Sequence, residues 1–296
     1  MSHKQKQSLR QLGNNKLKQM FTRGKGTSKH KDKTKYHGKP DPKKIYTDST
    51  LRVYKRGWNY FCDYLKIQGF HPKTFEEASN YVQSYVKEME SKGFSAYTIH
   101  TWVSAVCKVI GVPLTAYELP KRYRRNVKRS RHPAIRDAHF SEYNNLFLVE
   151  FCRAVGPRHF KELQKIHGHD LVKTEDGYGI YIRQGKGGKE RVAPIIGSEH
   201  VVAWIVEMCE KSGEELLFPH VSTAADIHSL RAEYACRVYQ RNARAVEAIP
   251  DKDRYYCRGD LYGEVFDKKA MKIASEALGH SRIGVIAQSY LWKLYE

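Results

Sequence analysis

The sequence contains no run of 18 or more apolar residues. Because a transmembrane helix needs about 20 consecutive, mainly apolar residues, this absence excludes a membrane-spanning helix. The N-terminus also lacks the apolar stretch that a secretory signal peptide contains. We therefore expect a cytoplasmic protein that has no membrane partner.

Cysteine is scarce and scattered. The six cysteines form no C-x-x-C pair and no other spacing typical of a zinc site. Most of them fall inside apolar helical patterns, where cysteine behaves as a small buried apolar residue. They are Cys62, Cys107, Cys152, Cys209, Cys236 and Cys257. We therefore expect reduced, buried thiols, and we expect neither a metal site nor a cofactor.

Acidic residues are few compared with basic ones. The chain has 52 Lys and Arg against 32 Asp and Glu, which gives a formal net charge of +20. Residues 1–44 hold 14 Lys and Arg against two acids, or +12, and "KRYRRNVKRSR" at 121–131 holds seven basic residues in eleven. Such charge favours a polyanionic partner. Acidic lipid or acidic protein would also satisfy it, but nucleic acid is the commonest form.

The composition changes along the chain and indicates separate parts. Residues 1–44 have too few apolar side chains to form a core, so we expect a disordered basic arm there. From 45 to 118 apolar residues recur every three or four positions, which predicts a small helical domain. Residues 119–136 are basic and contain two prolines, and we expect them to be a linker. The second domain then covers 137–296.

The second domain combines helical patterns with three short strand patterns. A turn signal at "EDG" precedes "YGIYIR" (178–183), and a second one at "GKGG" separates that run from "ERVAPI" (190–195). This pattern predicts three antiparallel strands joined by tight turns. Helices are expected over 141–155, 159–167, 198–212, 226–243 and 267–279. The sequence therefore predicts a mainly α protein with a small antiparallel β-sheet, of the α+β class.

Polar residues that could take part in catalysis lie at several points of this domain. Arg158 follows a predicted helix break, and Lys186 lies in the "GKGG" turn. His228 and Arg231 are three residues apart, so a helix places them on one face. Each of these residues, taken alone, is typical of a solvated or salt-bridged side chain. Together they could surround a phosphodiester with donors that match its oxygens.

The C-terminal stretch "ALGHSRIGVIAQSYLWKLYE" joins His280 to Tyr290, ten residues later. Tyr290 is either one more apolar contact of a terminal segment or a nucleophile. A tyrosine hydroxyl has an ordinary pKa of about 10, so it attacks poorly at neutral pH unless cations surround it. The arginines and histidines above would supply those cations. We expect the rival Tyr295 to be poorly positioned, because it lies near a fraying C-terminus.

The order of these motifs resembles that of the tyrosine recombinase, or phage integrase, family of site-specific recombinases. The resemblance covers about 45–296 and implies an N-terminal helical core-binding domain that binds DNA, followed by a mixed α/β catalytic domain. It implies that Arg158 and Arg231 clamp the scissile phosphate and stabilise its transition state. It also implies that Lys186 protonates the leaving 5′ oxygen.

The resemblance implies roles for the remaining polar residues too. His228 would assist phosphate binding and proton transfer, and His280 would donate a hydrogen bond to the phosphate. Tyr290 would be the nucleophile, which gives a 3′-phosphotyrosyl intermediate and a free 5′-hydroxyl. A covalent link conserves the phosphodiester energy without ATP. Cationic side chains around the phosphate can replace the metal ions of other nucleases, and the chain has no carboxylate cluster of the two-metal kind.

Three spacings differ from the family pattern, and one of them is the ten residues from His280 to Tyr290, where nine is commoner. The R-x-x-E-L motif is one residue longer here, from Arg158 to Glu162. His280 follows His228 by 52 residues, about twice the usual distance. We expect the surplus, over 242–268, to be an inserted hairpin.

The expected partner is double-stranded DNA, bound by a nucleoid-associated homotetramer on paired sites, with possible accessory DNA-bending proteins. The expected activity is integration or excision of a mobile element. Two alternatives stay open. One is a non-catalytic, basic DNA-binding protein on a recombinase fold. The other is strand cleavage and rejoining of the type IB topoisomerase kind, which shares the chemistry and needs no tetramer.

Overall fold

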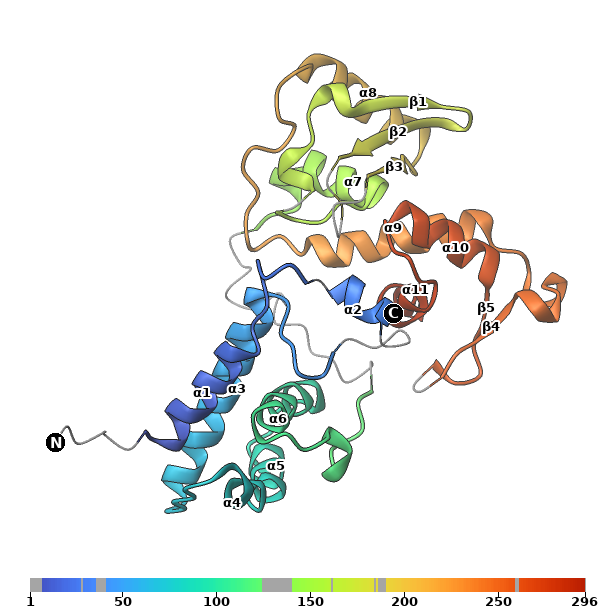
Figure 1. Cartoon of the computed structure of the whole chain (residues 1–296). Coiled ribbons are helices and arrows are strands. Elements are labelled where there is room, and N and C mark those ends of the chain that lie inside the picture. Colours follow the sequence, from blue (N-terminus) through green and yellow to red (C-terminus); the bar gives the residue numbers. More distant parts are fainter. Residues whose placement is uncertain are drawn as a thin grey trace. The chain divides into compact units, whose positions relative to one another are not determined.

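A computed structural model describes residues 7–27, 29–35, 41–123, 140–160, 162–183, 185, 190–258 and 261–295 (Figure 1). The chain divides into two compact units, 1–127 and 128–296. This division falls inside the range predicted as a linker. Most of that range lies outside the described residues, so the linker stays a prediction. No helix in the described ranges is long and apolar enough to cross a membrane.

The described part of the first unit is helical. Its helices are α1 (Leu9–Gln19), α2 (Lys29–Lys35), α3 (Asp48–Ile67), α4 (Phe75–Ser79), α5 (Val82–Ser91) and α6 (Ala96–Ile110). Side-chain caps fix where they begin: Thr47, Thr74 and Ser95 each accept a hydrogen bond from the backbone NH three residues on. Gly111 ends α6 with a φ of 92°.

The core of this unit is rich in aromatic side chains. Trp58 and Phe61 of α3 are fully buried, and the Phe61 ring meets the Tyr85 ring edge-on at 5.2 Å. Ile99 and Val103 of α6 pack into the same cluster. The periodic apolar residues of 45–118 therefore lie on helices that share one core.

The prediction of a disordered arm over 1–44 is wrong for helix α1. Leu17 of α1 is fully buried, and the backbone of Gly13 lies so close to Trp58 that an added Cβ would be 2.2 Å from ring atom Cε2. Trp58 Nε1 donates a hydrogen bond to the carbonyl oxygen of Arg10 at 3.2 Å. Helix α1 is thus part of the helical core.

The second unit combines helices with two small antiparallel sheets. Its main elements are α7 (Leu146–Val155), β1 (Leu171–Thr174), β2 (Gly177–Ile182), β3 (Arg191–Pro194), α8 (Glu199–Ser212), α9 (Ile227–Asn242), β4 (Arg254–Tyr256), β5 (Val265–Asp267), α10 (Lys268–Ala277) and α11 (Gly284–Ser289). The first sheet has the order β1-β2-β3, and the second pairs β4 with β5. In Figure 1, α10 lies beside the long helix α9. The α+β class predicted from the sequence is confirmed.

One predicted helix is absent from the described residues of this unit. The segment 159–167 contains only the 3-10 turn Leu163–Lys165, preceded by a turn in which Leu163 N donates to Arg158 O at 2.9 Å. This turn takes up the extra residue of the R-x-x-E-L motif and directs Glu162 inward, where its side chain is buried.

Two clusters of apolar side chains form the interior of the second unit. One joins α7 and the three-stranded sheet to α8, through residues such as Phe151, Ile180 and Ile205. The other joins α9, α10 and the C-terminal segment and includes Met271 and Leu291. All six cysteines of the chain are buried and free, as predicted.

Glycines end the two helices that border the candidate site. Gly156 ends α7 with a φ of 63°, and an added Cβ would be 2.2 Å from the Tyr234 ring. Gly279 follows α10 with a φ of 67°, and an added Cβ would be 3.1 Å from Arg191 Nη1. Both positions combine a left-handed backbone with a close neighbour, so they require glycine.

Candidate active site

The Glu162 carboxylate lies at the centre of the candidate site. Its side chain is fully buried, and three arginines surround it. Arg191 donates from Nη1 to Oε1 at 3.1 Å and from Nη2 to Oε2 at 2.8 Å. Arg158 donates from Nη1 to Oε1 at 3.0 Å, and Arg231 Nη1 lies 3.6 Å from Oε2. One buried carboxylate thus positions both arginines that the sequence predicted, together with a third.

The charges of this cluster leave a cationic surplus. Burial raises the pKa of Glu162, but the hydrogen bond from Arg191 and the charges of the three arginines outweigh it and lower that pKa. Burial lowers the pKa of Arg231. An arginine still remains a cation at neutral pH because its ordinary pKa is so high. Three cations therefore share one anion, and the site favours a further anion.

Arg231 connects three segments of the second unit. It lies in the first half of α9, whose N-cap Asp226 accepts a hydrogen bond from Ser229 N at 3.1 Å. The Arg231 side chain is only 2% exposed. Its guanidinium donates to Gly156 O at the end of α7 and to Leu278 O after α10, the latter at 2.6 Å. These contacts hold the guanidinium beside the C-terminal segment.

The Tyr290 hydroxyl lies among the groups that the sequence predicted for it. It is 3.0 Å from His280 Nε2, and Arg231 Nε donates to it at 3.4 Å. The His228 ring lies 5.6 Å from the Tyr290 ring, centroid to centroid. Tyr290 is 4% exposed and belongs to the second apolar cluster. It is therefore an apolar anchor whose polar end faces histidine and arginine.

Arg158 has a donor that is free to bind a ligand. Its Nη2 is buried and makes no hydrogen bond within the described part of the chain. Buried polar groups are almost always paired, so an orphaned donor at a cationic cluster indicates a place for an acceptor. A phosphate oxygen is an acceptor that matches guanidinium geometry.

The inserted hairpin expected over 242–268 is confirmed, since β4 pairs with β5 in antiparallel register. Asp267 at the end of β5 accepts hydrogen bonds from Arg244 Nε at 2.6 Å and from Lys269 N at 2.9 Å, which ties the hairpin to the start of α10. Because the insertion is anchored there, the extra residues leave His280 in contact with Tyr290.

Tyr295 lies in a different environment from Tyr290. Its hydroxyl donates to Glu264 Oε2 at 2.7 Å. Burial and this hydrogen bond to a carboxylate raise the pKa of Tyr295. A raised pKa makes the hydroxyl a poorer nucleophile, which favours Tyr290 over its rival.

The sequence does not reveal two residues of this cluster as site residues. Arg191, at the start of β3, was not among its candidates, although the side chain is only 7% exposed. Glu162 was noted only as a departure in spacing. The signal for Arg191 was weak, because an arginine after a turn is ordinarily solvated. Lys186 lies outside the described residues, so its placement stays a prediction.

The described chain has the fold of the tyrosine recombinases. A crystal structure of the XerH site-specific recombinase bound to a palindromic difH substrate, in its post-cleavage complex, matches with a TM-score of 0.50. The two chains are 13% identical, and the match covers 82% of this chain and 76% of XerH. At such low identity this likeness shows the fold alone.

Two further solved structures match this chain with lower TM-scores. The XerA recombinase is 18% identical, with 84% of this chain and 91% of that chain covered and a TM-score of 0.32. The Tn1549 transposon integrase in complex with transposon right end DNA is 13% identical, with 98% and 100% covered and a TM-score of 0.44. The sequence matches no protein-family model and no curated protein.

Proposed function

We propose that this chain is a site-specific DNA recombinase that cleaves and rejoins double-stranded DNA through a 3′-phosphotyrosyl intermediate on Tyr290. The observation that carries the proposal is the position of the Tyr290 hydroxyl, 3.0 Å from His280 Nε2 and 3.4 Å from Arg231 Nε. The recombinase fold and the orphaned donor of Arg158 add support.

In the proposed reaction, the Tyr290 oxygen attacks the phosphorus while the bond to the 5′ oxygen breaks. His280 Nε2, when unprotonated, accepts the phenol proton over the 3.0 Å that separates the two atoms. Arg158 Nη2 and Arg231 bind the non-bridging oxygens, where charge grows in the transition state. Lys186 supplies the proton that the leaving 5′ oxygen takes. Rejoining reverses these steps with the 5′-hydroxyl of another strand.

Glu162 and Arg191 serve this reaction as positioning residues. The buried carboxylate holds Arg158 and Arg231 on one side of the cluster, and Arg191 neutralises it through two hydrogen bonds. A fixed guanidinium loses little freedom when it binds a phosphate, which makes its contribution to the transition state larger.

DNA binding would rest on the basic segments of both units. The clusters at 1–44 and 121–131 supply the charge for phosphate contacts along the duplex. A recombinase must hold two duplexes together, so the proposal includes a homotetramer on paired sites. Integration or excision of a mobile element, with accessory DNA-bending proteins, is the activity that we propose for it.

The test compares two tyrosines on a nicked suicide substrate. Tyr290→Phe should fold, bind DNA and form no covalent protein–DNA adduct, whereas Tyr295→Phe should still form one. Peptide mapping of the trapped wild-type adduct should find the nucleotide on Tyr290. An adduct on Tyr295, or on no tyrosine, would overturn the proposal.

The adduct assay, together with assays of supercoil relaxation and of duplex joining, separates the alternatives. A non-catalytic DNA-binding protein forms no adduct in any variant. A topoisomerase-like enzyme forms the adduct on Tyr290 and relaxes supercoiled DNA, but it does not join two different duplexes. Joining of two distinguishable duplexes therefore identifies the recombinase.

A further inference from the structure

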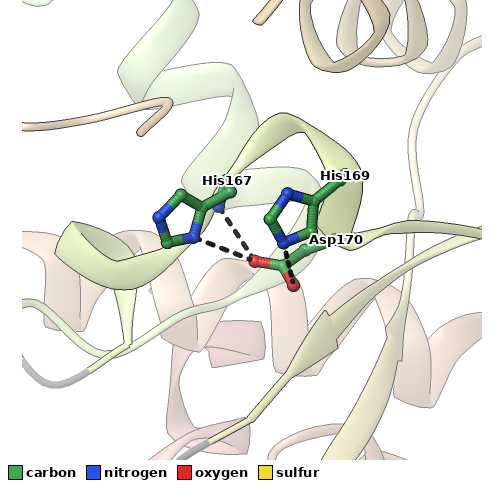
Figure 2. A group of neighbouring side chains, drawn as sticks. All are labelled: His167, His169 and Asp170. Atoms are coloured by element: carbon green, nitrogen blue, oxygen red, sulfur yellow. Dashed lines mark hydrogen bonds and ion pairs between the residues drawn. The ribbon is translucent and has the colours of Figure 1, made fainter. Parts of the chain in front are cut away.

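A group of metal-ligating side chains lies at the start of β1, outside the Glu162 cluster. His167, His169 and Asp170 offer ligand atoms that all lie within 4.8 Å of one another. Figure 2 shows both imidazole rings beside the Asp170 carboxylate. His167 Nδ1 is 3.7 Å from Oδ2, and His169 Nε2 is 3.9 Å from Oδ1. Two imidazoles and one carboxylate are the ligand set of many zinc sites.

The hydrogen bonds around His169 place the lone pair of its ring on Nε2, which becomes a ligand once Arg183 leaves. Its Nδ1 lies 3.0 Å from Glu214 Oε2, an arrangement in which Nδ1 carries the proton and donates a hydrogen bond to the carboxylate. This carboxylate–histidine pair is the usual second contact of a zinc-binding histidine. Nε2 then carries the lone pair, and it accepts a hydrogen bond from Arg183 Nη2.

His167 contributes an orphaned ligand atom. Its Nδ1 is buried and has no hydrogen-bond partner among the residues that the structure describes. The neighbouring Asp170 side chain is 1% exposed and is held in place by the backbone NH of His167, which donates to Oδ2 at 2.9 Å. The carboxylate is therefore fixed and buried, and one imidazole nitrogen beside it makes no hydrogen bond among the described residues.

A cation already occupies this place. Arg183, at the end of β2, donates to Asp170 Oδ1 from Nε at 2.9 Å, and its Nη2 lies 2.7 Å from the same oxygen. The Arg183 side chain is 52% exposed, so it can leave for solvent without breaking the core. The site therefore binds a guanidinium through the same lone pairs that a metal ion would use.

We propose that His167, His169 and Asp170 bind one divalent transition ion of the Zn²⁺ class in exchange for the Arg183 guanidinium. Zinc bonds of about 2.0–2.1 Å place tetrahedral ligand atoms roughly 3.3 Å apart, so the two carboxylate–imidazole pairs at 3.7 and 3.9 Å need a small contraction. The two imidazole nitrogens lie within 4.8 Å of each other and must reach the same spacing. The two rings are nearly parallel, at 7°, and one must turn to face a shared ion. His169 can turn because it is exposed.

The exchange would change the end of β2. Metal binding releases Arg183, which lies three residues before Lys186 in the sequence. The ion would instead crosslink His167 to the short turn Gly168–Asp170 and place its positive charge beside the buried Asp170 carboxylate. This inference rests on the local geometry and is independent of the proposed recombinase activity.

Titration of the full chain with Zn²⁺ alone, followed by calorimetry, tests the proposal. We expect saturable binding of one ion per chain. His167→Gln and His169→Gln should each weaken binding at least about tenfold, as the loss of a ligand does. Arg183→Gln should strengthen it, because the competing cation is gone. His200→Gln, the same change at an exposed histidine of α8, should leave the affinity unchanged.

A second measurement guards against variants that fold poorly. Zn²⁺ should raise the Tm of the wild type and raise that of Arg183→Gln further, since a ligand stabilises the state that it binds. Bound Co²⁺ should show d–d absorption without a thiolate charge-transfer band, because the cysteines are buried elsewhere. No saturable binding, wild-type affinity in the His167→Gln and His169→Gln variants, or weaker binding by Arg183→Gln would each overturn the proposal.

Discussion

The guanidinium of Arg191 and the carboxylate of Glu162 form a two-point pair inside the protein, with hydrogen bonds of 3.1 and 2.8 Å and almost no solvent on either side chain. Arg191 also donates from Nε to Ala277 O at 2.9 Å, which ties β3 to the end of α10. The pair therefore joins the sheet, the Glu162 turn and the C-terminal helices.

Removing Arg191 should destabilise the second unit strongly. Arg191→Met keeps the volume but leaves the Glu162 charge without its two-point partner, and breaking a buried pair in this way costs about 3–5 kcal/mol. Arg237→Met makes the same change at an arginine of α9 outside the cluster and should cost much less. Urea unfolding of both variants measures the difference. Equal losses would show that the Arg191 pair adds no stability of its own.

Glu162 should make the free energy of unfolding depend on pH in the acidic range. Because its pKa in the folded protein is lowered from the ordinary value of 4.5, its contribution is present above pH 4.5 and is lost as the pH falls below that value. Glu162→Gln should therefore be less stable than the wild type at neutral pH. The gap between the two unfolding free energies should shrink below pH 4.5. Glu207→Gln, at an exposed ion pair, should show only a small gap throughout.

The packing of α1 predicts the sign of the stability change that Gly13→Ala causes. In a solvated helix, Gly→Ala stabilises by about 1 kcal/mol. At Gly13 the new Cβ would lie 2.2 Å from Trp58, so Gly13→Ala should instead destabilise by about 1–3 kcal/mol through overpacking. Lys18→Ala on the exposed face of α1 should be nearly neutral. A stabilising effect of Gly13→Ala, measured by thermal unfolding, would contradict the packing of α1 on α3.

Under the proposed function, Lys186 and Arg231 should respond differently to a changed leaving group. Lys186→Ala should cleave poorly, and a substrate with a 5′-bridging sulfur should rescue it because a thiolate leaves without a proton. Arg231→Ala should stay inactive on both substrates, since losing a transition-state donor costs about 3–4 kcal/mol. Adduct formation on matched oxygen and sulfur duplexes is the measurement. Equal rescue of the two variants would contradict the role of general acid that is proposed for Lys186.

The sequence predicted those elements whose apolar residues recur regularly. The apolar residues that recur every three or four positions over 45–118 indicated the helices of that range, and turn signals on both sides of 178–183 indicated the sheet. The sequence also named Arg158, Arg231, His228, His280 and Tyr290, which the fold brings together. Short-range periodicity and motif order were enough for these features, because both are visible along the chain.

Other features depend on contacts between distant segments and could not be predicted. Helix α1 buries only Gly13 and Leu17, so its sequence resembles a solvated basic arm until Trp58 is placed against it. The turn that directs Glu162 inward is closed by two backbone hydrogen bonds to Arg158 O, from Glu162 N and Leu163 N. Arg191 enters the cluster only because β3 meets the end of α10. None of these long-range contacts leaves a mark in local composition.

The burial of Tyr290 and Arg231 sets a condition on the proposed reaction. At 4% and 2% exposure, neither group can touch the backbone of a duplex while the C-terminal segment keeps this position. Helix α11 and the turn Leu291–Tyr295 must shift first, and only a DNA contact extensive enough to drive that shift uncovers the phenol. Under the proposed function, a brief encounter with arbitrary DNA would then leave the strands intact, and the resting conformation would act as a safeguard against stray breaks.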